Sequence, residues 1–145
     1  MKTISFYFEE INKEIHYLIG TNKYDNFHVI DEALEDDLWF HSEEKSSSYV
    51  VCLLPNDLKI EEKEKQLLIQ KGAELCVSNT NKLTLLYRVP VIYTEVKNIR
   101  KTKTVGLVKV LNYQTIYITN LENESNTCKK NKRKMEKNKK ILINI

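Results

Sequence analysis

The stretch from Asp37 to His41 brings several kinds of side-chain chemistry together within a few residues. It holds the single tryptophan of the chain, Trp39, two positions before His41, and a run of three serines follows at 46–48. Asp37 and His41 could act as an acid–base pair, and a serine near the imidazole could act as a nucleophile. In the other interpretation, Trp39 and His41 share one face of a strand. They stack on bases if that face is exposed and belong to the core if it is covered.

Between Lys97 and Lys109 five cations lie close together in the sequence, with no aspartate or glutamate among them. Side chains of this kind bind phosphate groups, and Asn98 with the neighbouring threonines adds hydrogen-bond donors. Such contacts hold a nucleic acid without reading its base sequence. A solvated loop between two strands is the alternative interpretation. The five cations are Lys97, Arg100, Lys101, Lys103 and Lys109.

Lys23 and Tyr24 stand where a helix is expected to begin, directly after Gly20-Thr21-Asn22. The free backbone N–H groups and the dipole at a helix start favour an anion, so Lys23 is a candidate phosphate contact. The ring of Tyr24 could stack on a base. Its place in the apolar pattern of the helix favours the core, and we expect it there.

Apolar runs separated by turn residues indicate strands, and apolar residues three and four positions apart indicate helices. The pattern predicts an α+β domain with a mostly antiparallel sheet of about six to seven strands and two helices packed on one face. Residues 112–114 are expected to join the last two strands as a hairpin. Strands are expected at 4–8, 15–19, 38–40, 49–54, 87–94, 106–111 and 115–119, and helices at 23–33 and 58–78.

The net charge of +3 hides an uneven distribution. Residues 1–128 hold 15 Lys/Arg and 19 Asp/Glu, whereas residues 129–145 hold 8 Lys/Arg and 1 Asp/Glu. We expect residues 1–120 to form the folded domain and residues 121–145 to form a polar, lysine-rich tail that is disordered or helical. Such a tail attracts polyanions without sequence preference. Its candidate contacts are Lys129, Lys130, Lys132, Arg133 and Lys134.

Several functional classes lack their sequence signals here. No run of about 18 apolar residues predicts a membrane span and no leader pattern predicts secretion, so a cytoplasmic location is expected. Cys52, Cys76 and Cys128 are widely spaced, which argues against a disulfide framework and a zinc site and favours a core position for the first two. Glycine-rich nucleotide-binding motifs and kinase or deaminase spacings do not occur. No enzyme activity, catalytic residue, cofactor or metal is therefore expected.

Four blocks of the chain resemble, in the same order, the NFACT-R domain, which is regarded as an RNA-binding domain. The blocks are the Lys-Tyr-x-Asn segment after Gly20, the Asp-Leu-Trp-Phe-His signature with the serine run, the Val-x-Tyr-Thr strand from Val91 that runs into basic residues, and the Gly-x-Val start at Gly106. The resemblance covers roughly residues 4 to 119 and is greatest to the small stand-alone eukaryotic members. Tyr49 and Val77 depart from the family pattern, which has a histidine and a basic residue there.

The resemblance implies a non-catalytic RNA-binding protein that associates with ribosomes or tRNA in translation or ribosome-associated quality control. The basic loop and the tail would contact phosphates, with Lys23, Trp39 and His41 nearby. DNA is an alternative target, because lysine and arginine contacts to phosphate do not distinguish the two sugars. A protein-interaction adaptor, with Trp39, Phe40 and exposed strand edges as its docking surface, is the second alternative. The sequence does not indicate which protein would be the partner.

Overall fold

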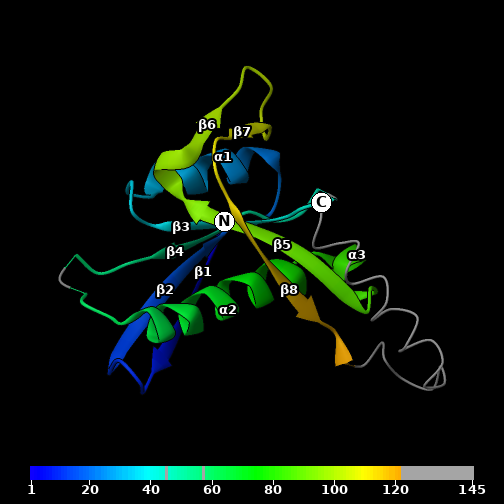
Figure 1. The fold of residues 1–145 in the computed structure, drawn as a ribbon. Coiled ribbons are helices and arrows are strands. Elements are labelled where there is room, and N and C mark those ends of the chain that lie inside the picture. Colours follow the sequence, from blue (N-terminus) through cyan, green and yellow to red (C-terminus); the bar gives the residue numbers. More distant parts are fainter. Residues whose placement is uncertain (45, 57, 122–145) are drawn as a thin grey trace.

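The computed structural model describes residues 1–44, 46–56 and 58–121, and its centre is one antiparallel sheet (Figure 1). The six strands follow the order β1-β2-β4-β3-β5-β8, and every neighbouring pair is antiparallel. The expected α+β fold class is therefore confirmed. The strands are β1 (Lys2–Phe8), β2 (Lys13–Ile19), β3 (Leu38–Ser42), β4 (Val50–Leu53), β5 (Arg88–Glu95) and β8 (Gln114–Thr119).

Two helices of the described residues cover the sheet, α1 (Lys23–Glu32) and α2 (Glu62–Ser78), and they lie on opposite faces (Figure 1). Side chains alternate along β3, so Phe40 packs in the core beneath α2 while Trp39 packs with Val29 and Ile30 of α1. The expectation that both helices share one face is wrong in this detail. Periodicity shows that each helix has an apolar side, but it does not show which face of the sheet that side covers.

Helix α2 begins at Glu62 and not at residue 58. Glu61 and Glu64 form a capping box, in which the Glu64 side chain accepts a hydrogen bond from the Glu61 backbone N–H at 3.0 Å. This reciprocal pairing satisfies free N–H groups of the first turn and sets the start of the helix. A further short helix, α3 (Asn81–Thr84), lies where only the end of α2 was expected.

The basic segment does not form a plain loop. After the 3₁₀ turn η1 (Val96–Asn98), β6 (Ile99–Lys101) pairs with β7 (Val108–Val110) as a separate two-stranded ribbon beside α1 (Figure 1). The expected hairpin between the last two strands is wrong, because β8 pairs with β5 instead. Burial explains the exchange: Ile118 packs in the α2 core, whereas Ile99, Val108 and Val110 pack in the α1 core.

The two described cysteines, Cys52 and Cys76, are free and buried, which confirms their predicted core positions. Burial raises the pKa of Cys52 to about 12 and that of Cys76 to about 11, so both remain thiols at neutral pH. Among the helices of residues 1–44, 46–56 and 58–121, none is long and apolar enough to cross a bilayer.

Candidate nucleic-acid interface

One cavity of about 540 Å³ lies where segments that are distant in the sequence meet. It is lined by the β2–α1 connection, His41 of β3, the serine run before β4, the start of α3 and the turn of the β6–β7 ribbon. None of its lining residues carries a carboxylate. We call it the lysine-rimmed cavity, and its lining consists of residues 20–23, Asn26, His41, residues 46–49, residues 79–80, Lys82 and residues 105–107.

The serine run is held in place by hydrogen bonds to neighbouring elements. The Ser47 hydroxyl accepts from the Ser42 backbone N–H at 3.0 Å. Ser48 bonds to the end of α2 twice, because its N–H donates to Thr80 Oγ1 and its hydroxyl donates to the Asn79 carbonyl, both at 3.0 Å. Among the described residues no hydrogen bond joins these serines to His41, so the serine–histidine arrangement is not formed.

Gly20 and Asn26 join the first sequence block to the second. Asn26 accepts a hydrogen bond from the Tyr49 backbone N–H through Oδ1 at 3.2 Å, and the Gly20 N–H donates to the Tyr49 carbonyl at 2.9 Å. A Cβ at position 20 would lie 2.0 Å from Asn26 Oδ1. Glycine is therefore required where the chain enters α1, because any side chain would displace this asparagine.

Three aromatic rings pack together beside the cavity, and two of them, His41 and Tyr49, line it. The rings of Trp39 and His41 stack in parallel with centroids 5.7 Å apart, and Tyr49 meets both rings edge-on. Only 1% of Trp39 is exposed, whereas His41 is partly exposed at the cavity wall. The face shared by Trp39 and His41 is thus covered at Trp39, which supports the imidazole from below and does not offer its own surface to a base.

His41 is neutral and keeps one nitrogen available. Its Nδ1 lies 2.6 Å from the Ser42 carbonyl, which can only accept, so Nδ1 carries the proton and Nε2 carries a lone pair. Desolvation by burial lowers the pKa of His41 below its ordinary value, and the charge of Lys82 lowers it further. The imidazole therefore offers a hydrogen-bond acceptor to the cavity at neutral pH.

Lys23 and Lys82 supply the positive charge of the rim. Lys82 Nζ donates to Ser46 Oγ at 2.8 Å, and Lys23 Nζ lies 5.3 Å from the ring centroid of Tyr24. Neither forms an ion pair with any carboxylate that the structure places. Tyr24 is 65% exposed, so the expectation that it belongs to the core is wrong. Lys82 was not identified from the sequence, because only the unforeseen helix α3 brings it to the serine run.

Two of the five cations of the basic segment are paired with carboxylates. Lys97 Nζ lies 3.2 Å from Glu95 and 3.5 Å from Asp36, and Lys101 pairs with Asp31 of α1. The hydrogen bond to Glu95 raises the pKa of Lys97. The basic segment contains no acidic residue in the sequence, but in the folded protein it has acidic neighbours. Folding brings carboxylates from α1 and from the chain after it to these two lysines.

The remaining cations of the segment lie on the outer side of the ribbon. Arg100 and Lys109 are register partners of β6 and β7, so their exposed side chains share one face. They and Lys103 have no carboxylate within ion-pairing distance in the described part of the chain. Asn98 has its amide engaged, because Nδ2 donates to Thr94 Oγ1 at 2.9 Å. The predicted tail contacts Lys129, Lys130, Lys132, Arg133 and Lys134 lie outside the described residues.

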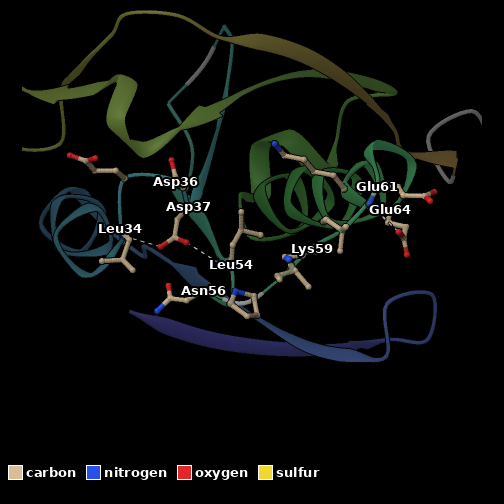
Figure 2. A pocket seen from close by; sticks show the side chains of 13 residues that line it. Leu34, Asp36, Asp37, Leu54, Asn56, Lys59, Glu61 and Glu64 are labelled. Carbon is tan, nitrogen blue, oxygen red and sulfur yellow. Dashed lines mark hydrogen bonds between the residues drawn. The ribbon is translucent and has the colours of Figure 1, made fainter.

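A larger cavity of about 1080 Å³ has the opposite electrostatic character (Figure 2). Five carboxylates and two lysines line it, and one of the carboxylates belongs to Asp37, which is 3% exposed. Figure 2 shows that Asp37 accepts hydrogen bonds from the backbone N–H groups of Leu34, at 2.8 Å, and Leu54, at 2.9 Å. The Asp37–His41 pair is not formed, because Asp37 precedes β3 and accepts hydrogen bonds from two backbone N–H groups, whereas His41 lies near the other end of β3.

These features define the class of protein. It is an antiparallel α+β domain with a cationic ribbon and a lysine-rimmed cavity that no carboxylate lines. The chain belongs to the NFACT protein RNA binding domain family, whose model matches residues 4–111. The sequence resemblance described above is therefore confirmed. The four sequence blocks that carry it all contribute to the lysine-rimmed cavity or to the neighbouring ribbon.

Relatives of known name agree with this membership. Coiled-coil domain-containing protein 25 of Mus musculus and that of Bos taurus are each 30% identical over 126 residues, which is 83% of this chain and 60% of theirs. The chain thus spans about 60% of the length of these curated relatives. The C-terminal part of the fibronectin/fibrinogen-binding protein from Streptococcus suis has the same fold. Its TM-score is 0.64 at 24% identity, over 82% of this chain and 45% of that one.

Proposed function

We propose that this chain binds RNA without catalysing a reaction on it. The observation that carries the proposal is the lysine-rimmed cavity, in which residues of the family's sequence blocks meet without any carboxylate. The membership in a family described as an RNA binding domain supports it. Lys23 and Lys82 bind phosphates at the cavity rim, and the surface continues over the turn of the ribbon to Arg100, Lys103 and Lys109.

The contacts of the ribbon differ from those expected from sequence. Lys97 and Lys101 are held by carboxylates, so they contribute less positive potential than their number indicates. Arg100 and Lys109 are register partners, so their like charges lie on one face of the ribbon, where a bound phosphate lowers the repulsion between them. The Arg100 guanidinium donates to the backbone carbonyls of Lys97 and Ile99. The outer face of the ribbon is therefore the part of the basic segment that contacts RNA.

The test measures RNA affinity across a salt series with the full chain. Lys23→Ala/Lys82→Ala and, separately, Arg100→Ala/Lys109→Ala should each weaken binding about tenfold near 0.1 M salt. Each should also reduce the slope of log affinity against log salt by about 1 to 2. The control Lys59→Ala/Lys65→Ala removes the same charge from the acidic cavity and should bind as the unaltered protein does. Affinity that is insensitive to salt and to both variants would exclude this function.

We further propose that the RNA is tRNA or ribosomal RNA, bound in the cytoplasm during translation or ribosome-associated quality control. The support is the family membership together with a phosphate-binding surface that does not depend on base sequence. Crosslinking in cell lysate, followed by sequencing of the attached RNA, tests this. Recovery of ribosomal RNA or tRNA positions supports the proposal, and recovery of unrelated transcripts in proportion to their abundance contradicts it.

DNA is the second candidate target, because phosphate contacts by Lys and Arg do not distinguish the two backbones. Competition by a DNA strand of the same sequence decides between them. The adaptor alternative has lost the aromatic part of its expected docking surface, since Trp39 is 1% exposed and Phe40 is fully buried, and it keeps only the edge strands β1 and β8.

A further inference from the structure

The lysine-rimmed cavity has features that phosphate binding alone does not require. One wall is formed by the turn of the ribbon, where Val105 is 39% exposed and Leu107 is 56% exposed. The exposed parts of these two aliphatic side chains do not contribute to binding of a phosphate group. They provide an apolar surface to a ligand that has a flat or apolar part of its own.

Two other lining residues of the cavity offer one hydrogen-bond acceptor and one donor. The acceptor is His41 Nε2, because Nδ1 donates to the Ser42 carbonyl. The donor is Asn26 Nδ2, since Oδ1 accepts from the Tyr49 N–H and Nδ2 has no partner among the described residues. The edges of nucleobases present donors and acceptors side by side, and proteins read them in this way when the base is unpaired.

The volume of about 540 Å³ lies within the range of about 300 to 1,000 Å³ that is usual for small-molecule sites. A single phosphate group would leave most of this space unfilled. Cations, an apolar surface and polar groups in one cavity lining together match the parts of a nucleotide.

We infer that the lysine-rimmed cavity holds one unstacked nucleotide of a single-stranded RNA segment, with its phosphate at Lys23 and Lys82 and its base between the ribbon turn and His41. The inference rests on the proposed RNA binding and specifies what the cavity recognises. A paired base cannot enter, because its edge and both faces are covered in a duplex. The domain therefore selects loops, bulges or chain ends over uninterrupted helices.

Tyr49, which stands where the family pattern has a histidine, positions the apolar wall. Its hydroxyl donates to the Gly106 carbonyl at 2.6 Å. Gly106 has a φ of 85°, and a Cβ there would lie 2.6 Å from the Cβ of Lys23. The ribbon turn can thus lie close to the start of α1 only with glycine at this position, and the tyrosine hydroxyl holds it there.

The experiment records amide NMR shifts of the full chain with each of the four nucleoside 5′-monophosphates, with ribose 5-phosphate and with inorganic phosphate. Monophosphates should bind saturably at the amides that line the cavity, at least tenfold more tightly than ribose 5-phosphate. Tyr49→Phe and Leu107→Ser leave the charge unchanged, and each should lower mononucleotide affinity about threefold or more without altering phosphate affinity. Lys59→Ala/Lys65→Ala serves as the control and should bind mononucleotides normally.

Equal affinity for the monophosphates and for inorganic phosphate would reduce the cavity to an anion site and overturn the inference. So would shifts located outside the cavity, or no mononucleotide binding by a protein that still binds long RNA. If the unaltered protein bound no RNA of any kind, the proposed function itself would be contradicted. A second measurement compares a single strand with a blunt duplex of the same length. We expect a preference for the single strand that disappears in Leu107→Ser, and equal binding of both by the unaltered protein contradicts the inference.

Discussion

At the scale of single residues, His41 combines burial with an available acceptor nitrogen. Its folded-state pKa lies below its ordinary value of about 6.5, with burial as the largest cause. As pH falls through 6.5, the unfolded chain takes up a proton that the folded state resists. The contribution of His41 to the free energy of unfolding is therefore fully present above about pH 6.5, and it is lost as the pH falls toward the folded-state pKa.

We expect the free energy of unfolding to fall when the pH is lowered from 7.5 to 5. In His41→Gln this fall should be smaller, because glutamine takes up no proton. Urea unfolding at the two pH values measures the difference. His28→Gln, which makes the same substitution at an exposed position of α1, is the comparison variant. A pH dependence that is identical in the unaltered protein and His41→Gln would contradict this assignment.

Trp39 supplies a second prediction. Its indole N–H is buried without a hydrogen-bond partner in the described structure, which costs about 1 to 3 kcal/mol. Trp39→Phe removes that group along with some packing. Its loss of stability should therefore be clearly smaller than the about 3 to 5 kcal/mol that is usual for Trp→Ala in a core. RNA affinity should stay within about twofold in Trp39→Phe, because the ring is covered. A folded Trp39→Phe protein with strongly reduced affinity would show that the indole contacts RNA.

At the scale of elements, α2 approaches the sheet closely at one glycine. A Cβ at Gly72 would lie 2.3 Å from the Phe40 ring, which is itself fully buried. Gly72→Ala should destabilise the fold by about 1 to 3 kcal/mol through overpacking, although alanine is the better helix former by about 1 kcal/mol. Thermal unfolding measures it. Gln70→Ala on the exposed side of α2 is the control, and an equally stable Gly72→Ala protein would mean that the helix can shift outward.

The ribbon gives the second prediction at this scale. Lys101 pairs with Asp31, and Lys97 pairs with both Asp36 and Glu95. Asp31→Asn/Asp36→Asn therefore frees Lys101 and removes one of the two carboxylates beside Lys97, on an already cationic element. We expect RNA affinity to rise severalfold at low salt, with a salt dependence steeper by up to about 1.4 in the slope. A salt series on RNA binding measures both. Glu9→Gln/Glu10→Gln, at the far end of the sheet, tests whether the gain follows from net charge alone. An unchanged affinity would mean that this side of the ribbon does not face RNA.

At the scale of the whole molecule, the charge balance of residues 1–128 is negative and that of residues 129–145 is positive. A polyanion is therefore repelled by most of the surface of residues 1–128. The lysine-rimmed cavity and the outer face of the ribbon are the cationic exceptions. The predicted domain boundary near residue 120 and the RNA-binding role of the tail remain predictions.

Replacement of Lys129, Lys130, Lys132, Arg133 and Lys134 by glutamine should weaken RNA binding and reduce its salt dependence. It should leave mononucleotide binding in the cavity unchanged, because that contact is local. Fluorescence anisotropy with long RNA and NMR with mononucleotides measure the two effects in one variant. Equal loss in both would mean that the tail contributes to the cavity itself.

The sequence by itself determined the local elements and the family. The β-prone run at 15–19 identified a strand, and the apolar spacing after Lys23 identified α1, because both signals depend on neighbours within a few residues. The Trp-Phe-His block contributes His41 to the lysine-rimmed cavity, and its role in binding remains a prediction. Only the tertiary structure decided how the strands after β2 pair, that α1 and α2 cover opposite faces, and that Lys101 meets Asp31, 70 residues away. The reason is physical: strand pairing, burial and ion pairing are set by residues that folding brings together, and a local pattern of residue types does not record those distances.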